Sequence, residues 1–332
     1  MSLSRSLLPL LLISPALHAQ PAFIARPQAF KTLINPQCSH CVDEAKWRAG
    51  ELRGSDPVLA WVRGYSDGGA IPVRFFLNPY RVISDTYGVF VYDPDAGFAR
   101  GFAPSLDFRF YGWRNGVMVM RHKDGTLYSC LTGVAFDGPR KGDRLKRVPT
   151  LVTDWGHWLK SYPRGVAYHM FEKYQPVELP TRPNTDSVRT RAPLDKRLPE
   201  DTAVLGLSTG KTNRAYPLDQ VARAGVIQED VDGKPCIVLW YGATCTAAAY
   251  RPLATPLTKD GGKPRLVTLK ADEHSAIAPF IDSETGSRWD ITGRAVEGAL
   301  KGWTLEWLDG TQVKWFAWAA EHPDTSIYRA SE

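Results

Sequence analysis

Short runs of β-branched and aromatic residues, separated by turn residues, dominate the hydrophobic pattern of the chain. The clearest runs are VFVY at 89–92, GVMVMRH at 116–122 and CIVLWY at 236–241. Such runs are typical of β-strands, and Asp-Gly pairs such as those at 124–125 and 232–233 are typical of tight turns. The pattern therefore predicts a protein built mainly from antiparallel strands.

Helical spacing occurs in only a few short segments. Residues 42–53 carry one apolar stripe. Two later segments place tryptophans on one helical face: Trp155 with Trp158, and Trp315 with Trp318. A threonine precedes each of these segments and a proline follows it: Thr153 and Pro163, and Thr311 and Pro323. We expect each threonine to cap a short helix and each proline to end it.

Residues 132–168 align with residues 292–328 at a constant offset of 160, without a gap. The identical pairs include three glycines, namely Gly133/Gly293, Gly138/Gly298 and Gly142/Gly302, and the tryptophans Trp155/Trp315 and Trp158/Trp318. The front parts align more loosely, with residues 70–73 over 215–218. An internal repeat of this length predicts two copies of one domain.

These features predict a β-rich α+β fold made of two similar domains from an internal duplication. In each domain, mainly antiparallel strands are closed by a short helix that carries tryptophan. We place the first repeat domain at 55–169 and the second at 201–330. A segment with a CxxC motif and a helix (20–54) precedes them, and a linker with five prolines (170–200) separates them.

The N-terminus predicts export. Residues 1–19 contain Arg5, a short apolar run from Leu7 to Ile13, and a small residue, Ala19, at the expected cleavage point. This is the arrangement of a secretory signal peptide, and the apolar run is too short for a membrane span. We therefore expect a periplasmic or secreted protein with no membrane span.

Composition narrows the function only slightly. The 332 residues are 43% hydrophobic and 23% charged, with a formal net charge of +6, and the basic residues do not form a stripe. A mild, dispersed excess of positive charge does not favour nucleic-acid binding. We therefore expect the partner to be a small molecule or a protein.

The back parts of the two repeats resemble the signature of a bacterial exported family, the domain of unknown function 3179. The residues that carry the resemblance are DGTLYSCLTGVAFDGPRKGDRL at 124–145 and GSRWDITGRAVEGALKGWTL at 286–305. The resemblance implies two tandem, degenerate copies of this domain, and it implies no reaction.

Each repeat departs from the family pattern in its front part. Tyr80-Arg81 and Gly225-Val226 stand where the family usually has His-Glu. Asp93 and Tyr241 stand where a family cysteine follows the strand, and Cys130 takes the place of a common glutamine. The resemblance therefore does not transfer any chemistry of that histidine and cysteine to this chain.

The cysteines are the first candidates for chemistry. Cys38 and Cys41 form a CxxC motif before the predicted helix, where a helix N-terminus lowers a thiol's pKa. In an exported protein a stabilising disulfide is the favoured interpretation, with redox and metal roles as alternatives. Cys236 and Cys245 are close enough in sequence to form a second bridge, which leaves Cys130 as the spare thiol.

A second candidate is a copper site. Met118, Met120 and His122 alternate along one predicted strand, so their side chains share a face. Thioether and imidazole ligands suit copper, although two core methionines and a histidine at a strand end are the simpler interpretation.

The 11 tryptophans are a third candidate. At helical spacing they are expected in the core, and an aromatic groove for a glycan or peptide is the alternative. Two hypotheses follow for the whole protein. One is a non-catalytic exported protein that binds a ligand or partner at the junction of its two domains. The other is a periplasmic thiol-redox or copper-binding protein.

Overall fold

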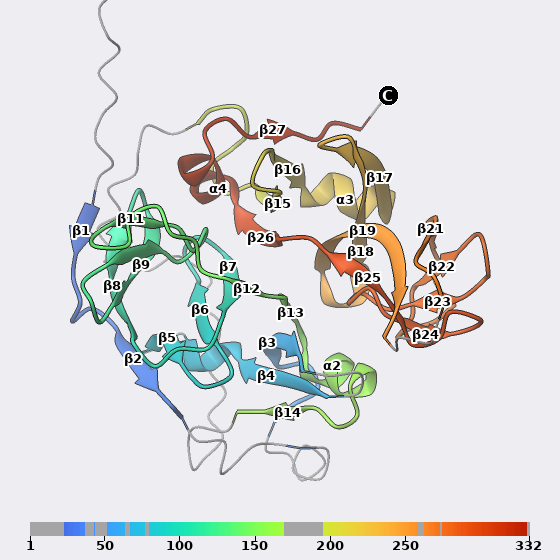
Figure 1. The fold of residues 1–332 in the computed structure, drawn as a ribbon, viewed down its shortest axis with the longest axis horizontal. Coiled ribbons are helices and arrows are strands. Elements are labelled where there is room, and N and C mark those ends of the chain that lie inside the picture. The colour runs from blue at the N-terminus through green and yellow to red at the C-terminus, as the bar shows by residue number, and fades with distance from the viewer. Residues whose placement is uncertain are drawn as a thin grey trace, which may run out of the picture.

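Figure 1 shows a computed structural model of the chain. It describes residues 23–36, 43, 52–63, 67–76, 80–168, 195–257, 262–272 and 274–330. The expected signal peptide, Cys38 and Cys41 with most of the helix expected at 42–53, and most of the linker lie outside these residues. Below, the first half is the described chain up to residue 168, and the second half begins at residue 195.

Three sheets form the first half (Figure 1). One has the order β13-β3-β4-β14: β13 (Thr150–Asp154), β3 (Pro57–Val62), β4 (Gly68–Pro72) and β14 (Val166–Ala167). Another has the order β12-β7-β6-β5-β2: β12 (Arg147–Val148), β7 (Phe98–Phe102), β6 (Val89–Asp93), β5 (Tyr80–Ser84) and β2 (Lys31–Ile34). The third has the order β1-β8-β9-β10-β11: β1 (Phe23–Ala25), β8 (Phe108–Arg114), β9 (Val117–His122), β10 (Leu127–Ser129) and β11 (Ala135–Asp137).

Three more sheets form the second half. One has the order β26-β15-β16-β27: β26 (Gly310–Lys314), β15 (Ala203–Ser208), β16 (Asn213–Pro217) and β27 (Ser326–Ile327). Another has the order β17-β18-β19-β20, with β25 also paired to β19: β17 (Val226–Val231), β18 (Lys234–Tyr241), β19 (Thr246–Pro256), β20 (Arg265–Leu266) and β25 (Trp303–Trp307). The third has the order β21-β22-β23-β24: β21 (Leu269–Ala271), β22 (Phe280–Asp282), β23 (Arg288–Trp289) and β24 (Ala295–Glu297).

The fold is β-rich, as the hydrophobic pattern predicts. The predicted strands at 89–92, 116–122 and 236–241 are present as β6, β9 and β18. The turn at 232–233 joins β17 to β18, and both of its residues have positive φ. This is the backbone conformation of the two-residue turns that suit antiparallel strands.

Three α-helices occur in the described residues: α2 (Trp155–Ser161), α3 (Leu218–Ala224) and α4 (Trp315–Glu321); the 3-10 helices are η1 (Val73–Phe76) and η2 (Gly242–Thr244). Helices α2 and α4 end just before Pro163 and Pro323, as predicted. The predicted caps are wrong. Thr153 and Thr311 lie inside β13 and β26, and each of these strands runs directly into its helix. Sequence analysis also missed α3.

The tryptophans of α2 and α4 are core residues, as expected: Trp155, Trp158, Trp315 and Trp318 are all at most 1% exposed. Helix α4 packs into the other half of the protein. Its apolar face joins a cluster in which most residues come from the first half, many of them from β6, β7, β8 and β9. The two halves therefore share a core and do not pack as two separate globules.

Candidate functional site

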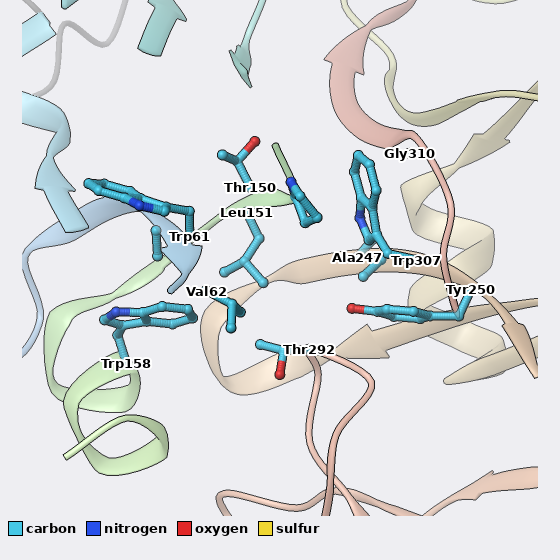
Figure 2. Close-up of a pocket in the computed structure, with 13 residues that line it drawn as sticks. Trp61, Val62, Thr150, Leu151, Trp158, Ala247, Tyr250, Thr292, Trp307 and Gly310 are labelled. Atoms are coloured by element: carbon cyan, nitrogen blue, oxygen red, sulfur yellow. The ribbon is translucent and has the colours of Figure 1, made fainter. Parts of the chain in front are cut away.

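A cavity of about 180 Å³ lies between the two halves, which we call the junction cavity (Figure 2). Its lining residues from the first half are Ala60, Trp61, Val62, Pro149, Thr150, Leu151 and Trp158. Those from the second half are Ala247, Ala248, Tyr250, Thr292, Trp307 and Gly310. Four aromatic side chains thus face one space from two sides, and most of the remaining lining is aliphatic.

The first wall depends on two glycines in β4. Trp61 pairs with Gly69 in the antiparallel β3–β4 register, and its indole lies back across that glycine. A Cβ on Gly69 would be 2.2 Å from Trp61 Cζ2, and one on Gly68 would be 2.6 Å from the Trp158 ring. Only glycine allows two indoles to lie this close to a strand, so β4 positions both tryptophans at the cavity.

The second wall depends on β19 and β25. Tyr250 and Trp307 are cross-strand partners in the β19–β25 pair. The Tyr250 hydroxyl donates a 2.8 Å hydrogen bond to the Ile291 carbonyl, and burial raises the pKa of this phenol well above its ordinary value. Tyr250 is therefore neutral, and its hydroxyl already has a partner inside the protein.

Polar contacts between the halves hold the two walls together. The Tyr162 and Thr292 hydroxyls are 2.7 Å apart, and Thr292 also donates to Asp290 at 2.6 Å. Arg294 pairs with Asp290 and donates to the Ser161 carbonyl at 2.6 Å. Because the Thr292 hydroxyl is occupied by these contacts, the cavity offers a ligand mainly apolar surface.

The described cysteines give no support to thiol chemistry. Cys130, Cys236 and Cys245 are all free, so the structure does not contain the suggested Cys236–Cys245 bridge. Burial raises the pKa of Cys130 well above its ordinary value and that of Cys236 to about 11. A raised pKa disfavours the thiolate, which is the reactive form. Cys245 is exposed, whereas Cys38 and Cys41 lie outside the described residues.

The candidate copper ligands lie on one strand, β9, as expected, but in different surroundings. Met118 and Met120 belong to the large apolar cluster and are at most 1% exposed. Both ring nitrogens of His122 face carboxylates: Nδ1 is 3.0 Å from Asp124, and Nε2 is 3.8 Å from Asp107. Core packing accounts for the two methionines, and the two carboxylate contacts account for His122. In the described part of the chain, no three His, Cys, Asp or Glu residues group as metal ligands.

Sequence analysis expected Trp158 in the core and predicted none of the residues of the cavity as a site. Trp61, Tyr250 and Trp307 lie on three different strands and belong to no local motif. The available signal was the tryptophan content together with the expectation of a binding site at the junction, and neither of these specifies residues.

Comparison with known proteins identifies the family of the chain but no similar individual protein. No curated protein and no solved structure shows significant similarity to the chain. None of the helices in the described residues is long and apolar enough to cross a membrane. A family described as protein of unknown function (DUF3179) matches residues 96–325, which span the back of the first half and most of the second. That match covers more than half of the chain, so the protein belongs to the DUF3179 family.

Proposed function

We propose that this protein is a non-catalytic binding protein that holds a small apolar ligand, or an apolar group of a larger ligand, in the junction cavity. The observation that carries the proposal is the open space between Trp61 and Trp158 on one side and Tyr250 and Trp307 on the other. Ligand sites are typically concave, largely apolar and placed between domains.

The size and chemistry of the cavity favour a single ring or a branched aliphatic group. A cavity of about 150 Å³ lined by aliphatic and aromatic side chains accommodates benzene, and the junction cavity measures about 180 Å³. A glycan is less well matched because it needs many hydrogen-bonding groups. Here the hydroxyls of Tyr250 and Thr292 already bond within the protein.

We further propose that the two halves are degenerate copies of one domain. Sheets β13-β3-β4-β14 and β26-β15-β16-β27 share one strand order, with two antiparallel pairs followed by a parallel pair. Isolated bridges join Val134 to Arg144 and Arg294 to Thr304, which is the offset of 160 seen in the sequence. On this proposal the cavity lies where two related domains meet.

The sequence features at 1–19 support the proposal that the protein is exported and acts in the periplasm or outside the cell. Detection of the cleaved chain in a periplasmic or culture fraction tests this proposal. Recovery of only the uncleaved chain in the cytoplasm contradicts it.

Toluene is a suitable probe for the cavity, with glucose as the polar comparison. We expect isothermal titration calorimetry on the chain from residue 20 onward, which we call the mature chain, to show saturable binding of toluene at one site and no binding of glucose. Absence of toluene binding at millimolar concentration would contradict the proposal that the junction cavity binds a small apolar ligand.

A matched pair of variants locates the binding. Val62 lines the cavity and is 43% exposed, so Val62→Trp blocks the space at low cost to folding. Leu266 is 59% exposed and is not a lining residue, so Leu266→Trp is the control. We expect Val62→Trp to weaken toluene binding at least tenfold and Leu266→Trp to leave it unchanged. Equal affinities in the two variants would place the binding elsewhere.

A further inference from the structure

A buried group of charges lies between β7 of the first half and the residue that precedes β26 of the second. Arg100 and Arg147 both donate to the same oxygen of Asp309, Oδ1, at 2.5 and 3.1 Å. The two arginine side chains are only 3% and 8% exposed. Two guanidinium groups therefore share a single carboxylate in a nearly dry environment.

The arrangement leaves donors without acceptors. Nη1 and Nη2 of Arg147 and Nε of Arg100 are buried and have no hydrogen-bond partner. An uncompensated buried charge is costly, and buried polar groups are normally paired. Burial lowers the pKa of Arg100 and that of Arg147, the latter to about 9, so Arg147 remains protonated near neutral pH. The site therefore has spare positive charge and spare donors together.

One neighbouring side chain, Arg144, adds to the positive potential. The charge of the exposed Arg144 lowers the pKa of Arg100, of Arg147 and of His322. His322 faces Asp324 and Asp309 as well as the arginines, and burial is the main cause that lowers its pKa to about 4. His322 is therefore neutral at pH 7, and the surrounding positive charge comes from the arginines.

The strand register relates this site to the junction cavity. Arg147 pairs with Phe102 between β12 and β7, whereas Trp307 pairs with Tyr250 between β25 and β19. Arg147 and Trp307 are 160 residues apart, which is the offset of the sequence repeat. Matching positions thus carry a cation in the first half and an indole in the second.

We propose that Arg100 and Arg147 form a binding site for an oxyanion, a carboxylate or phosphate group, with Arg144 at its exposed edge. The fork of a guanidinium group matches the two oxygens of such a group, and charge-assisted bonds of this kind are the stronger class of hydrogen bond. The oxyanion accepts hydrogen bonds from the free Nη atoms of Arg147. Its negative charge balances the positive charge that the single carboxylate of Asp309 does not neutralise.

The test uses the mature chain in a chloride-free buffer of constant ionic strength. Inorganic phosphate and acetate are titrated separately by calorimetry, which distinguishes the two sources of the oxyanion. We expect saturable binding of at least one of them. We expect Arg147→Met to weaken it at least tenfold, because that variant removes the free donors. Lys141→Met makes the same charge change at an exposed residue six positions earlier in the chain, so it is the control and should bind as the unmodified protein does.

A second variant keeps the proposal testable if Arg147→Met does not fold. Asp309→Asn removes the carboxylate that competes for both arginines, so the oxyanion should bind several-fold more tightly. The proposal is overturned if neither anion binds the unmodified chain at millimolar concentration. It is also overturned if Lys141→Met weakens binding as much as Arg147→Met, or if Asp309→Asn leaves the affinity unchanged.

Discussion

Two glycines offer a direct test of how the tryptophans are packed. A Cβ added to Gly69 would be 2.2 Å from the Trp61 ring, and one added to Gly206 would be 2.2 Å from the Trp318 ring. Because the overlap is the same at both sites, the two variants, Gly69→Ala and Gly206→Ala, should differ in stability only if one indole can move away more freely than the other. The difference between their free energies of unfolding therefore reports that freedom. Both glycines lie in strands and have no positive φ, so the variants do not strain the backbone.

The surroundings of the two indoles differ. Trp318 is fully buried, and its Nε1 donates a 2.9 Å hydrogen bond to the Thr325 hydroxyl. Trp61 borders the junction cavity, so its ring has open space beside it. Overpacking in a core costs about 1–3 kcal/mol. We therefore expect Gly206→Ala to lower the free energy of unfolding by about 3 kcal/mol and Gly69→Ala to lower it by about 1 kcal/mol.

Urea unfolding followed by circular dichroism measures the loss in free energy of unfolding for both variants. Toluene titration measures whether the cavity still binds its probe. If Trp61 moves into the cavity, Gly69→Ala should weaken toluene binding, whereas Gly206→Ala should leave it intact. Gly242→Ala is the control because its Cβ would have only ordinary contacts, and surface changes of this kind stay within about 0.5 kcal/mol. Equal costs for the first two variants, or unchanged toluene binding in Gly69→Ala, would refute the packing argument.

Trp155→Ala and Trp315→Ala should each lower the free energy of unfolding by about 3–5 kcal/mol, since both side chains are fully buried; a loss below about 1 kcal/mol in chemical denaturation would contradict their core role. Among the described cysteines, Cys245 should react rapidly with iodoacetamide because it is exposed, and Cys236 should react only after unfolding because it is buried. Mass spectrometry of the labelled protein checks both rates, and early labelling of Cys236 would count against the structure. His322 has a folded pKa of about 4, below its unfolded value, so the unfolded chain binds the proton first. Stability should therefore fall as the pH drops from about 6.5 towards 4. His322→Gln should flatten that part of a pH–melting curve, and an unchanged slope would contradict the lowered pKa.

Local patterns in the sequence were sufficient for many elements of the fold. Alternating and β-branched runs predicted β6, β9 and β18, because a strand's periodicity is a property of a few consecutive residues. The paired tryptophans and following prolines predicted the ends of α2 and α4 for the same reason. The beginnings of these helices were not predictable in this way. Thr153 and Thr311 are good capping residues, yet strand pairing in β13 and β26 holds both in extended backbone.

The candidate sites depended on tertiary structure. The junction cavity brings Trp61 next to Tyr250, and the buried charge group brings Arg100 next to Asp309, although 209 residues separate that last pair. No local period can encode such distant contacts, since they arise only when strands pair and the two halves pack. The sequence by itself determined the strands, the tryptophan helices and the repeated register. Tertiary packing decided that the matching positions, Arg147 and Trp307, lie in environments of opposite chemistry, because Arg147 donates to Asp309 of the second half and Trp307 lines the junction cavity.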